Sequence, residues 1–582
     1  MTSYRDGVRA LTCLLLCALP ASAQRASPKT APFQRVDLEG DVVTVLVERR
    51  TYRLVAVDGI ETARLLAACR EQRPDAWRTR FRLQLPEVIA SLRGQPPGAT
   101  VSLVLSATRS GERVVIEKAP LTRANYRRLF WQQQGFAGPA PPMQFDRRLS
   151  RAAAARDFAQ LERAVRQRFA YFDWRRRTVE PLALPGDIVE PTAGQLAQIV
   201  ARWLAPFGDP NTQVQGLRDT LAGRFLPFEL RPVGNRFVAL QNGQLLNFQA
   251  PFVRALDARR PREWLKAVAM YLPHGNEAYM RYAGPAYLNQ VEALRPFFQA
   301  KKRGSVWVTL DSADGQVRIR TEHRLVPEPP TAAPRPKPQM RVIEGGIGYV
   351  PLPTMESEEA FERHIAPILP ALQETQAAVL DLRGNNSSRR GLLRVLLPVF
   401  LKEPVVSQVA RVRRSGPEDP EGYLADFDMH PRAWKGWNQA QRAAIAAFAE
   451  TFRPAWATDD ARFSDWHYLV PQRTDRGYDK PLVVLVDGGT RNSAEVLAFA
   501  LQHAGRAVVV GEASGGSDGG PVTLTLENSR LRVTLSTIAS YRPDGKLYLG
   551  SSVQPSLLRP RDPVDWTGAA DAQLQAALER LR

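Results

Sequence analysis

The sequence predicts an α/β protein of several domains whose C-terminal part contains a mostly parallel sheet. Three observations support this class. The chain has 582 residues, and since a domain usually has about 100–200 residues, we expect three or four domains. Hydrophobic residues make up 44% and charged residues 24%, which is ordinary for a globular protein and excludes wholesale disorder. In residues 341–582, nearly continuous apolar strands alternate with helical patterns, as in a sheet covered on both faces.

The first residues have the features of a secretory signal peptide. Arg5 and Arg9 precede an apolar run over residues 10–19, which is followed by the small-x-small site Ala21-Ser-Ala23. The run is shorter than the roughly 20 apolar residues that a membrane-spanning helix needs. We therefore expect cleavage near Ala23 and export to the periplasm or the exterior.

The chain has three cysteines, too few for a disulfide framework. Lipidation at Cys17 is an alternative to simple export, although Leu-Leu-Leu precedes this cysteine instead of the small residues that a lipoprotein site favours. After cleavage only Cys69 remains, and we expect it to be a buried thiol.

Two proline-rich stretches, residues 135–142 and 326–338, divide the rest of the chain. Proline fixes φ and removes a backbone donor, so both stretches are predicted to be exposed linkers. The predicted organisation is a signal peptide (1–23), an N-terminal α/β accessory module (24–134), a linker (135–147), a helical segment (148–225), a β-rich region with helices (226–325), a second linker (326–340) and a core domain (341–582).

Short alternating apolar patterns predict the elements of the N-terminal module. Strands are expected over residues 42–47 and 52–57, closed by Asp58-Gly59, with a helix near residues 61–70 and a hairpin over residues 99–116. This arrangement resembles a peptide-binding PDZ domain, and an ordinary accessory domain is the alternative interpretation.

The helical segment is rich in arginine, and the whole chain carries a formal net charge of +20. Arginines are dense between residues 151 and 177, which raises nucleic-acid binding as a hypothesis. Phe169 and Tyr171 fit a buried face better than base stacking, however, and the excess charge is spread along the chain. We therefore expect a solvated basic face and no nucleic-acid partner, while contact with an anionic surface stays open on the charge alone.

The C-terminal core places polar, glycine-rich loops after successive apolar strands. A strand is predicted over residues 347–352 and an amphipathic stretch over 357–375. The three strand-loop pairs that follow are residues 377–382 with loop 383–391, residues 482–486 with loop 487–495, and residues 507–510 with loop 511–519. In parallel sheets, ligands bind outside the carboxyl ends of the strands. The functional site is therefore expected where these loops meet.

The order of these loops resembles the tail-specific (C-terminal-processing) serine peptidases. The resembling motifs are Asp381-Leu-Arg-Gly-Asn385, then Ser493-Ala-Glu495, then Gly511-Glu-Ala-Ser-Gly-Gly516, and the likeness covers residues 345–582. Upstream, Asp209-Pro-Asn-Thr212 is similar to the family's Asp-x-His-Thr segment. The resemblance implies a ClpP/crotonase-like core, a serine-type peptidase (hydrolase) acting in proteolysis, an exported protein, and a polypeptide substrate such as a C-terminal tail of another exported protein.

The family's catalytic residues do not carry over onto this sequence. The nucleophile of the family lies three residues before the motif glutamate, a position that Asn492 occupies here. The position of the catalytic lysine holds Ser517, and the position of the histidine used by other members holds Asn211. A serine hydroxyl is a poor nucleophile until a base takes its proton, so losing both groups would leave only binding and positioning.

Two interpretations of the site therefore stay open. In the first the protein is a catalytically inactive peptide-binding or scaffold protein, a pseudoenzyme, and Asn492 merely begins a helix in a capping-box-like manner with Glu495. In the second, Ser493 is the nucleophile at a helix N-terminus. The candidate bases are then the histidines His323, His467 and His503.

Further residues are expected near the substrate. The family's oxyanion segment Asn-x-Gly-Gly reads Asn385-Asn-Ser-Ser388 here, so Asn385, Ser387 and Ser388 are the corresponding oxyanion or substrate-binding candidates, together with Gly515 and Gly516. The sequence has no Cys-x-x-Cys, His-Glu-x-x-His or Gly-Lys-Ser/Thr motif. No metal or other cofactor is therefore expected.

Overall fold

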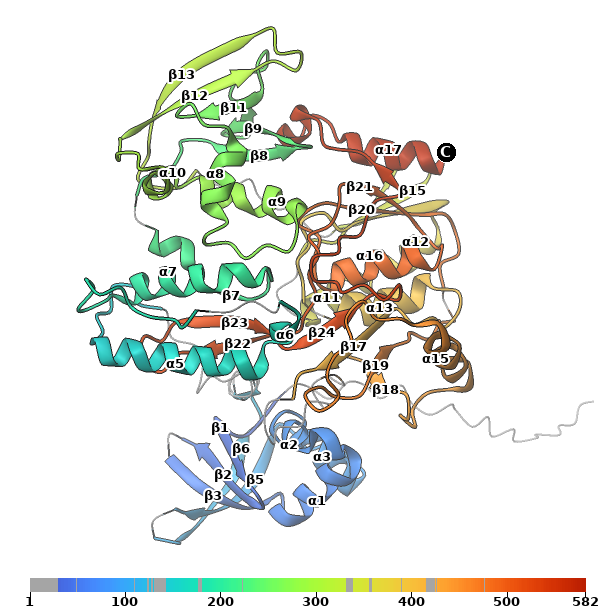
Figure 1. Cartoon of the computed structure of the whole chain (residues 1–582). Helices are drawn as coiled ribbons and strands as arrows, with labels where there is room; N and C mark the ends of the chain where they lie inside the picture. The colour runs from blue at the N-terminus through green and yellow to red at the C-terminus, as the bar shows by residue number, and fades with distance from the viewer. Residues whose placement is uncertain are drawn as a thin grey trace, which may run out of the picture. The chain divides into compact units, whose positions relative to one another are not determined.

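The computed structural model describes residues 30–582 with several gaps; the residues left out between them are 49, 109, 123–124, 127–128, 130–142, 176–179, 222, 331–338, 355–357, 389, 415–423, 425–426 and 476. The chain divides into two units, one formed by residues 1–133 with 137–139 and the other by the remaining residues (Figure 1). The predicted signal peptide, the predicted linker up to residue 142 and the proline-rich residues 331–338 lie outside the described residues.

An antiparallel sheet with the strand order β1-β2-β3-β5-β6 forms the N-terminal unit, and helices accompany it (Figure 1). The strands are β1 (Arg35–Glu39), β2 (Val42–Val47), β3 (Arg50–Val57), β4 (Ile60–Glu61), β5 (Thr100–Ala107) and β6 (Arg113–Pro120), and the helices are α1 (Thr62–Gln72), η1 (Pro74–Ala76), α2 (Trp77–Leu83) and α3 (Leu85–Arg93). The predicted strands, helix and hairpin are present. Cys69 is buried as predicted, and burial raises the pKa of its thiol to about 12. The PDZ interpretation stays a prediction.

Helices and a second antiparallel sheet follow in the other unit (Figure 1). The helices are α5 (Arg151–Arg168), α6 (Phe172–Arg175), α7 (Ala193–Leu204), α8 (Pro261–Val268), α9 (Glu277–Leu288) and α10 (Val291–Leu294), with the 3-10 turns η2 (Ala205–Phe207), η3 (Leu217–Thr220) and η4 (Arg295–Phe298). The sheet has the order β10-β9-β11-β12-β13, with β8 paired to β9; the strands are β8 (Glu229–Val233), β9 (Arg236–Gln241), β10 (Gln244–Leu245), β11 (Phe252–Leu256), β12 (Ser305–Asp311) and β13 (Arg318–Arg324). Phe169 and Tyr171 are fully buried, while Arg156 and Arg163 of α5 are exposed. The basic stretch is therefore a solvated face, as predicted.

The core sheet has the order β14-β15-β16-β20-β21-β25, and all its pairs are parallel except β14 with β15. Its strands are β14 (Arg341–Ile343), β15 (Ile347–Pro351), β16 (Ala377–Asp381), β20 (Leu482–Val486), β21 (Val508–Gly511) and β25 (Leu557–Leu558). Strand β20 has the predicted bounds.

Alternate residues of these strands face two separate apolar clusters, which explains why the strands are apolar along their whole length. Ala378 and Leu380 of β16 pack in a cluster with four helices: α11 (Glu358–Ile365), α12 (Ile368–Gln373), α13 (Gly391–Phe400) and α16 (Ser493–His503). Ala377 and Val379 pack in the cluster of the C-terminal helix α17 (Ala572–Leu581). Both faces of the sheet are thus covered, as the sequence predicts.

Two small sheets complete this unit and connect distant parts of the chain. Their orders are β18-β19-β17-β24 and β22-β23-β7. The strands are β7 (Gln213–Val214), β17 (Gln408–Val412), β18 (His430–Pro431), β19 (His467–Leu469), β22 (Pro521–Thr525), β23 (Arg532–Ser536) and β24 (Ile538–Tyr541); helix α15 (Gln439–Thr451) and the turn η5 (Pro563–Thr567) are the remaining elements. None of the helices in the described part of the chain is both long enough and apolar enough to cross a membrane.

Candidate active site

The loops after β16, β20 and β21 meet at one edge of the parallel sheet. The backbone N–H of Ser493 donates to the carbonyl of Ser387 at 3.0 Å, which joins the first loop to the second. The N–H of Asn492 donates to the carbonyl of Ser517 at 2.7 Å, which joins the second loop to the third. The sequence-predicted residues of all three loops are thus held together by main-chain hydrogen bonds.

Asn492 occupies a strained backbone conformation at the turn between β20 and α16. Its φ is 56° and its ψ is −132°, a region that residues other than glycine rarely adopt. A sharp strand-to-helix turn presents the nucleophile in the α/β-hydrolase fold. The predicted capping box is wrong, because the Asn492 side chain makes no cap hydrogen bond to α16. The reason is that both polar atoms of its amide face other loops.

The Asn492 side chain is fixed on both sides by hydrogen bonds. Its Oδ1 accepts from Nδ2 of Asn211 at 2.7 Å, and its own Nδ2 donates to the carbonyl of Asn386 at 2.9 Å. The residue is 3% exposed. The position that the resemblance assigns to the nucleophile therefore holds a buried, fully hydrogen-bonded amide.

Asn211 brings the two predicted base positions to the same place. Its Nδ2 also donates to Oγ of Ser517 at 2.7 Å, so one amide nitrogen bridges Asn492 and Ser517. Two features place Asn211 there. Its backbone N–H donates to Oδ1 of Asp209, and the following strand β7 pairs with β23.

This asparagine–serine cluster has little capacity for acid–base chemistry. An asparagine amide does not ionise in the physiological range, and a serine hydroxyl is a poor base. The three residues Asn211, Asn492 and Ser517 are therefore joined by hydrogen bonds but include neither an activated nucleophile nor a general base.

Ser493 lies directly after this cluster at the first position of α16. Its side chain is 0% exposed, and within the described part of the chain its Oγ has no hydrogen-bond partner. The predicted bases are engaged elsewhere. His323 contacts Thr321, His467 contacts the carbonyl of Asp465, and His503 lies at the opposite end of α16, stacked on Phe499. The structure does not bring a histidine to Ser493, and its catalytic role stays a prediction.

The predicted oxyanion residues take part in bracing the first loop. Asn385 is buried, its Oδ1 accepts from the N–H of Ser387 at 2.9 Å, and its Nδ2 donates to the carbonyl of Leu352 at 2.6 Å. Ser388 is exposed. The amide of Ser387 is thus already engaged within its own loop.

The glycines of the third loop are engaged in a similar way. The N–H of Gly515 donates to the carbonyl of Thr490 at 2.9 Å, and the N–H of Gly516 donates to Glu495 at 3.0 Å. Gly516 has a φ of +65°, and a Cβ there would meet Nδ2 of Asn276 at 2.2 Å. These glycines therefore allow close packing of the loop, and their role in substrate binding stays a prediction.

Glu495 is a positioning residue whose role sequence reasoning missed. It is fully buried and accepts hydrogen bonds from the hydroxyl of Ser514, the N–H of Gly516 and the N–H of Ser517, the last at 2.8 Å. Burial raises the pKa of its carboxyl to about 7, against the lowering effect of these hydrogen bonds. Its signal in the sequence was a carboxylate in the first turn of an otherwise apolar helix.

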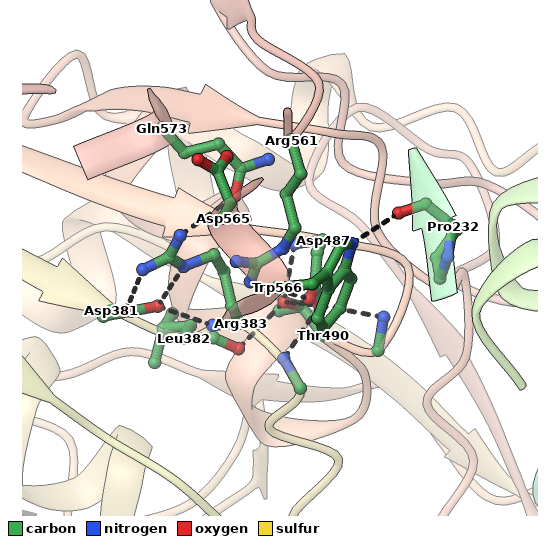
Figure 2. Close-up of polar contacts among 12 residues, drawn as sticks. Pro232, Asp381, Leu382, Arg383, Asp487, Thr490, Arg561, Asp565, Trp566 and Gln573 are labelled. Carbon is green, nitrogen blue, oxygen red and sulfur yellow. Dashed lines mark hydrogen bonds and ion pairs between the residues drawn. The ribbon is translucent and has the colours of Figure 1, made fainter. Parts of the chain in front are cut away.

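The Asp-Leu-Arg-Gly-Asn motif holds the C-terminal helix against the ends of the strands (Figure 2). Arg383 donates from Nε to Oδ1 of Asp381 at 2.8 Å and from Nη2 to Oδ2 of Asp571 at 2.7 Å. It also donates from Nη1 to Gln573 at 3.0 Å. The guanidinium holds the pKa of the buried Asp381 carboxyl below its usual value, against the effect of burial. This part of the motif is therefore structural.

A pocket lies beside this network and is lined by residues from α9 and from the loops after β20 and β21. Asp487, labelled in Figure 2, accepts from the N–H of Gly384 at 2.8 Å and lies 3.8 Å from Arg561. Glu512 also lines the pocket, and burial together with the charge of Asp487 raises its pKa to about 7. Among the described residues no group of three or more His, Cys, Asp or Glu side chains could hold a metal ion.

Comparisons with known proteins agree with the resemblance that the sequence motifs indicate. The sequence model described as "Peptidase family S41" matches residues 346–557. The "Carboxy-terminal-processing protease" of Bartonella bacilliformis is 35% identical over 81 residues, which is 14% of this chain; the chain thus spans 18% of the length of that curated relative.

Among solved structures, the crystal structure of mature CPAF is similar with a TM-score of 0.50 and 16% identity, covering 74% of this chain and 95% of that one. At this identity the likeness concerns the fold. The resemblance inferred from the sequence is thus confirmed over residues 346–557, a region that is similar to the tail-specific S41 peptidases.

Proposed function

We propose that the protein binds extended segments or C-terminal tails of other polypeptides at the loop edge of the core sheet and does not hydrolyse them. The peptidase-like fold supports a polypeptide ligand. One common way in which proteins bind peptides is the addition of a strand to a sheet edge, where main-chain hydrogen bonds give affinity and side-chain pockets give selectivity. The proposed ligands are exported proteins, since the first residues of the chain resemble a signal peptide.

One observation carries the non-hydrolytic part of the proposal. The amide of Asn211 bridges Asn492 and Ser517 with two hydrogen bonds of 2.7 Å, at the positions where the family resemblance expects a nucleophile and a base. In serine hydrolases, removing the nucleophile and its base leaves only the contribution of binding and positioning. A site of this kind retains the means to hold a chain but lacks the means to cleave it.

Binding and turnover of an unfolded protein test this proposal together. The purified protein is titrated with β-casein in biolayer interferometry, and the same mixture is analysed by mass spectrometry after overnight incubation. Saturable binding without new peptides is expected. Absence of binding would refute the binding proposal, whereas stoichiometric product peptides would show that the protein is a peptidase.

A peptidase that uses Ser493 is the second candidate, and one observation favours it. The Oγ of Ser493 has no partner among the described residues and lies at the N-terminus of an 11-residue helix, whose dipole stabilises a developing anion. This candidate predicts covalent labelling by a fluorophosphonate that is lost in Ser493→Ala. The matched control is Ser536→Ala, because Ser536 is also fully buried and its Oγ is also unpartnered. Absence of label in the wild-type protein removes this candidate.

A further inference from the structure

Arg491 is a buried cation that has no counterion among the residues the structure describes. It is 7% exposed, and in the part of the chain that the structure describes neither its Nε nor its Nη1 has a hydrogen-bond partner. It also forms no ion pair with a described carboxylate. Leaving a charge buried and unpaired is strongly unfavourable, because desolvation is not offset by any attraction. An arginine in this state is suited to receive an anion from outside the chain.

Packing holds the guanidinium in place without neutralising it. The ring of Tyr279 on α9 covers one side, with Cζ of Arg491 at 4.5 Å from the ring centroid. The aliphatic part lies against Gly515, where an added Cβ would meet Cγ of Arg491 at 2.4 Å. A cation–π contact attracts the cation but does not satisfy its N–H donors. The side chain is therefore positioned in advance, and its Nε and Nη1 donors stay unpaired among the described residues.

We propose that Arg491 is an anion-binding subsite that receives a carboxylate of the bound polypeptide. This inference rests on the proposed polypeptide binding and names the chemistry that the ligand must carry. Arg491 immediately precedes Asn492, so the subsite lies in the same turn as the asparagine–serine cluster. The planar guanidinium fits a carboxylate with two parallel hydrogen bonds, a geometry that an ammonium group cannot reproduce.

A polypeptide can supply a carboxylate from its C-terminus or from an acidic side chain, and three probe peptides distinguish these sources. All are acetylated decapeptides of Ala, Val and Ser. The first ends in a free carboxylate, the second has the same sequence with a C-terminal amide, and the third is the amide with one internal Glu. Isothermal titration calorimetry measures their binding to the wild-type protein, Arg491→Gln, Arg491→Lys and the control Arg580→Gln, which removes an exposed arginine of α17.

The wild-type protein is expected to bind at least one carboxylate-bearing peptide tenfold or more tightly than the neutral amide. Arg491→Gln should abolish this preference and bind all three peptides as the wild type binds the amide. Arg491→Lys should keep part of the preference, and Arg580→Gln should keep all of it. If the free-acid peptide has the highest affinity, the ligand group is a C-terminal carboxylate. If the peptide with the internal Glu has the highest affinity, the ligand group is an acidic side chain.

Two outcomes separate this inference from the function on which it rests. Equal affinity of the wild-type protein for all three peptides overturns the carboxylate subsite but leaves polypeptide binding intact. No binding of any peptide, together with no binding of β-casein, overturns both. A preference that Arg491→Gln retains in full also overturns the subsite. Because the comparison of acid with amide uses the wild-type protein, it can refute the subsite even where an Arg491 variant does not fold.

Discussion

At the scale of single residues, one amide nitrogen joins the residues at the centre of the site. Nδ2 of Asn211 donates to both Asn492 and Ser517, so three neutral side chains share the place of a catalytic pair. Such a network is stable because each hydrogen bond satisfies a buried polar atom. It also fixes the relative positions of residues 492 and 517, which makes the site a candidate for repair.

Asn492→Ser combined with Ser517→Lys should introduce a serine–lysine pair and produce measurable cleavage of β-casein. The reason is that both positions already lie within hydrogen-bond distance of one atom, and partial burial would lower the pKa of the new lysine. Product peptides are measured by mass spectrometry and the nucleophile by fluorophosphonate labelling.

The control for this repair is Asn492→Ser alone, which supplies a hydroxyl without a base and should remain inactive. If the double variant is folded, as judged by circular dichroism, but neither cleaves casein nor takes the label, then residue 492 does not correspond to the family's nucleophile.

Motif spacing predicts that Asn492, Ser517 and Asn211 correspond to the family's catalytic positions, and this correspondence stays a prediction. Spacing could not show that their side chains bond to one another, since Asn211 lies 281 residues before Asn492. The sequence also could not predict that Nε and Nη1 of Arg491 lack partners among the described residues. Whether a side chain is paired depends on which residues the fold places around it and not on the local sequence pattern.

At the scale of elements, Glu495 connects helix α16 to the third loop through a buried carboxyl. Its pKa is raised from 4.5 to about 7, chiefly by burial. The folded state therefore holds a proton between pH 4.5 and 7 that the unfolded state has released. The contribution of this group to the free energy of unfolding is largest below pH 4.5 and is lost as the pH rises to 7.

We expect the wild-type protein to lose unfolding free energy between pH 5 and pH 8, with Glu495 contributing at most about 3 kcal/mol. Glu512, whose pKa is also about 7, acts in the same direction. Urea denaturation at both pH values is the measurement. Glu495→Gln should show a smaller loss, and the exposed Glu579→Gln is the control. An equal loss in all three proteins would mean that Glu495 does not titrate in this range.

Glycines at the ends of elements give a second test at this scale. Gly511 ends β21 with a φ of +127°, and a Cβ there would meet the carbonyl oxygen of Val486 at 2.2 Å. Gly505 has a φ of +63° but open space around it. Gly505→Ala should therefore cost about 1 kcal/mol of unfolding free energy through backbone strain alone. Gly511→Ala should cost about 1–3 kcal/mol more through overpacking, as urea denaturation would show. Equal costs would contradict the close contact.

Most elements of the core could be predicted from sequence because an apolar run bounded by polar residues identifies a buried strand, as with residues 482–486. The first residue of α16 is the predicted one, but the capping box was misjudged for a physical reason. Asn492 is a preferred capping residue, yet tertiary hydrogen bonds to Asn211 and Asn386 outweigh the local one. The two-residue strand β7 is also too short for any periodic pattern, and only its pairing with β23 defines it.

At the scale of the whole molecule, the chain consists of two units with separate apolar cores. The N-terminal unit packs residues such as Val45, Leu66 and Phe81 around its own sheet. A domain with its own core is able to fold by itself. A fragment of residues 24–134 should therefore give a well-dispersed NMR spectrum and a cooperative thermal transition. A spectrum typical of an unfolded chain would show that this module depends on the rest of the protein.

The pairing of β7 with β23 has a consequence for the order of events during synthesis. Asn211 is made early, but its partners Asn492 and Ser517 follow 281 and 306 residues later. Contacts of such long sequence separation form slowly, because the intervening loop must close first. The proposed binding site therefore cannot form before residue 517 has been made, and a protein secreted unfolded would acquire it only late in its own translocation.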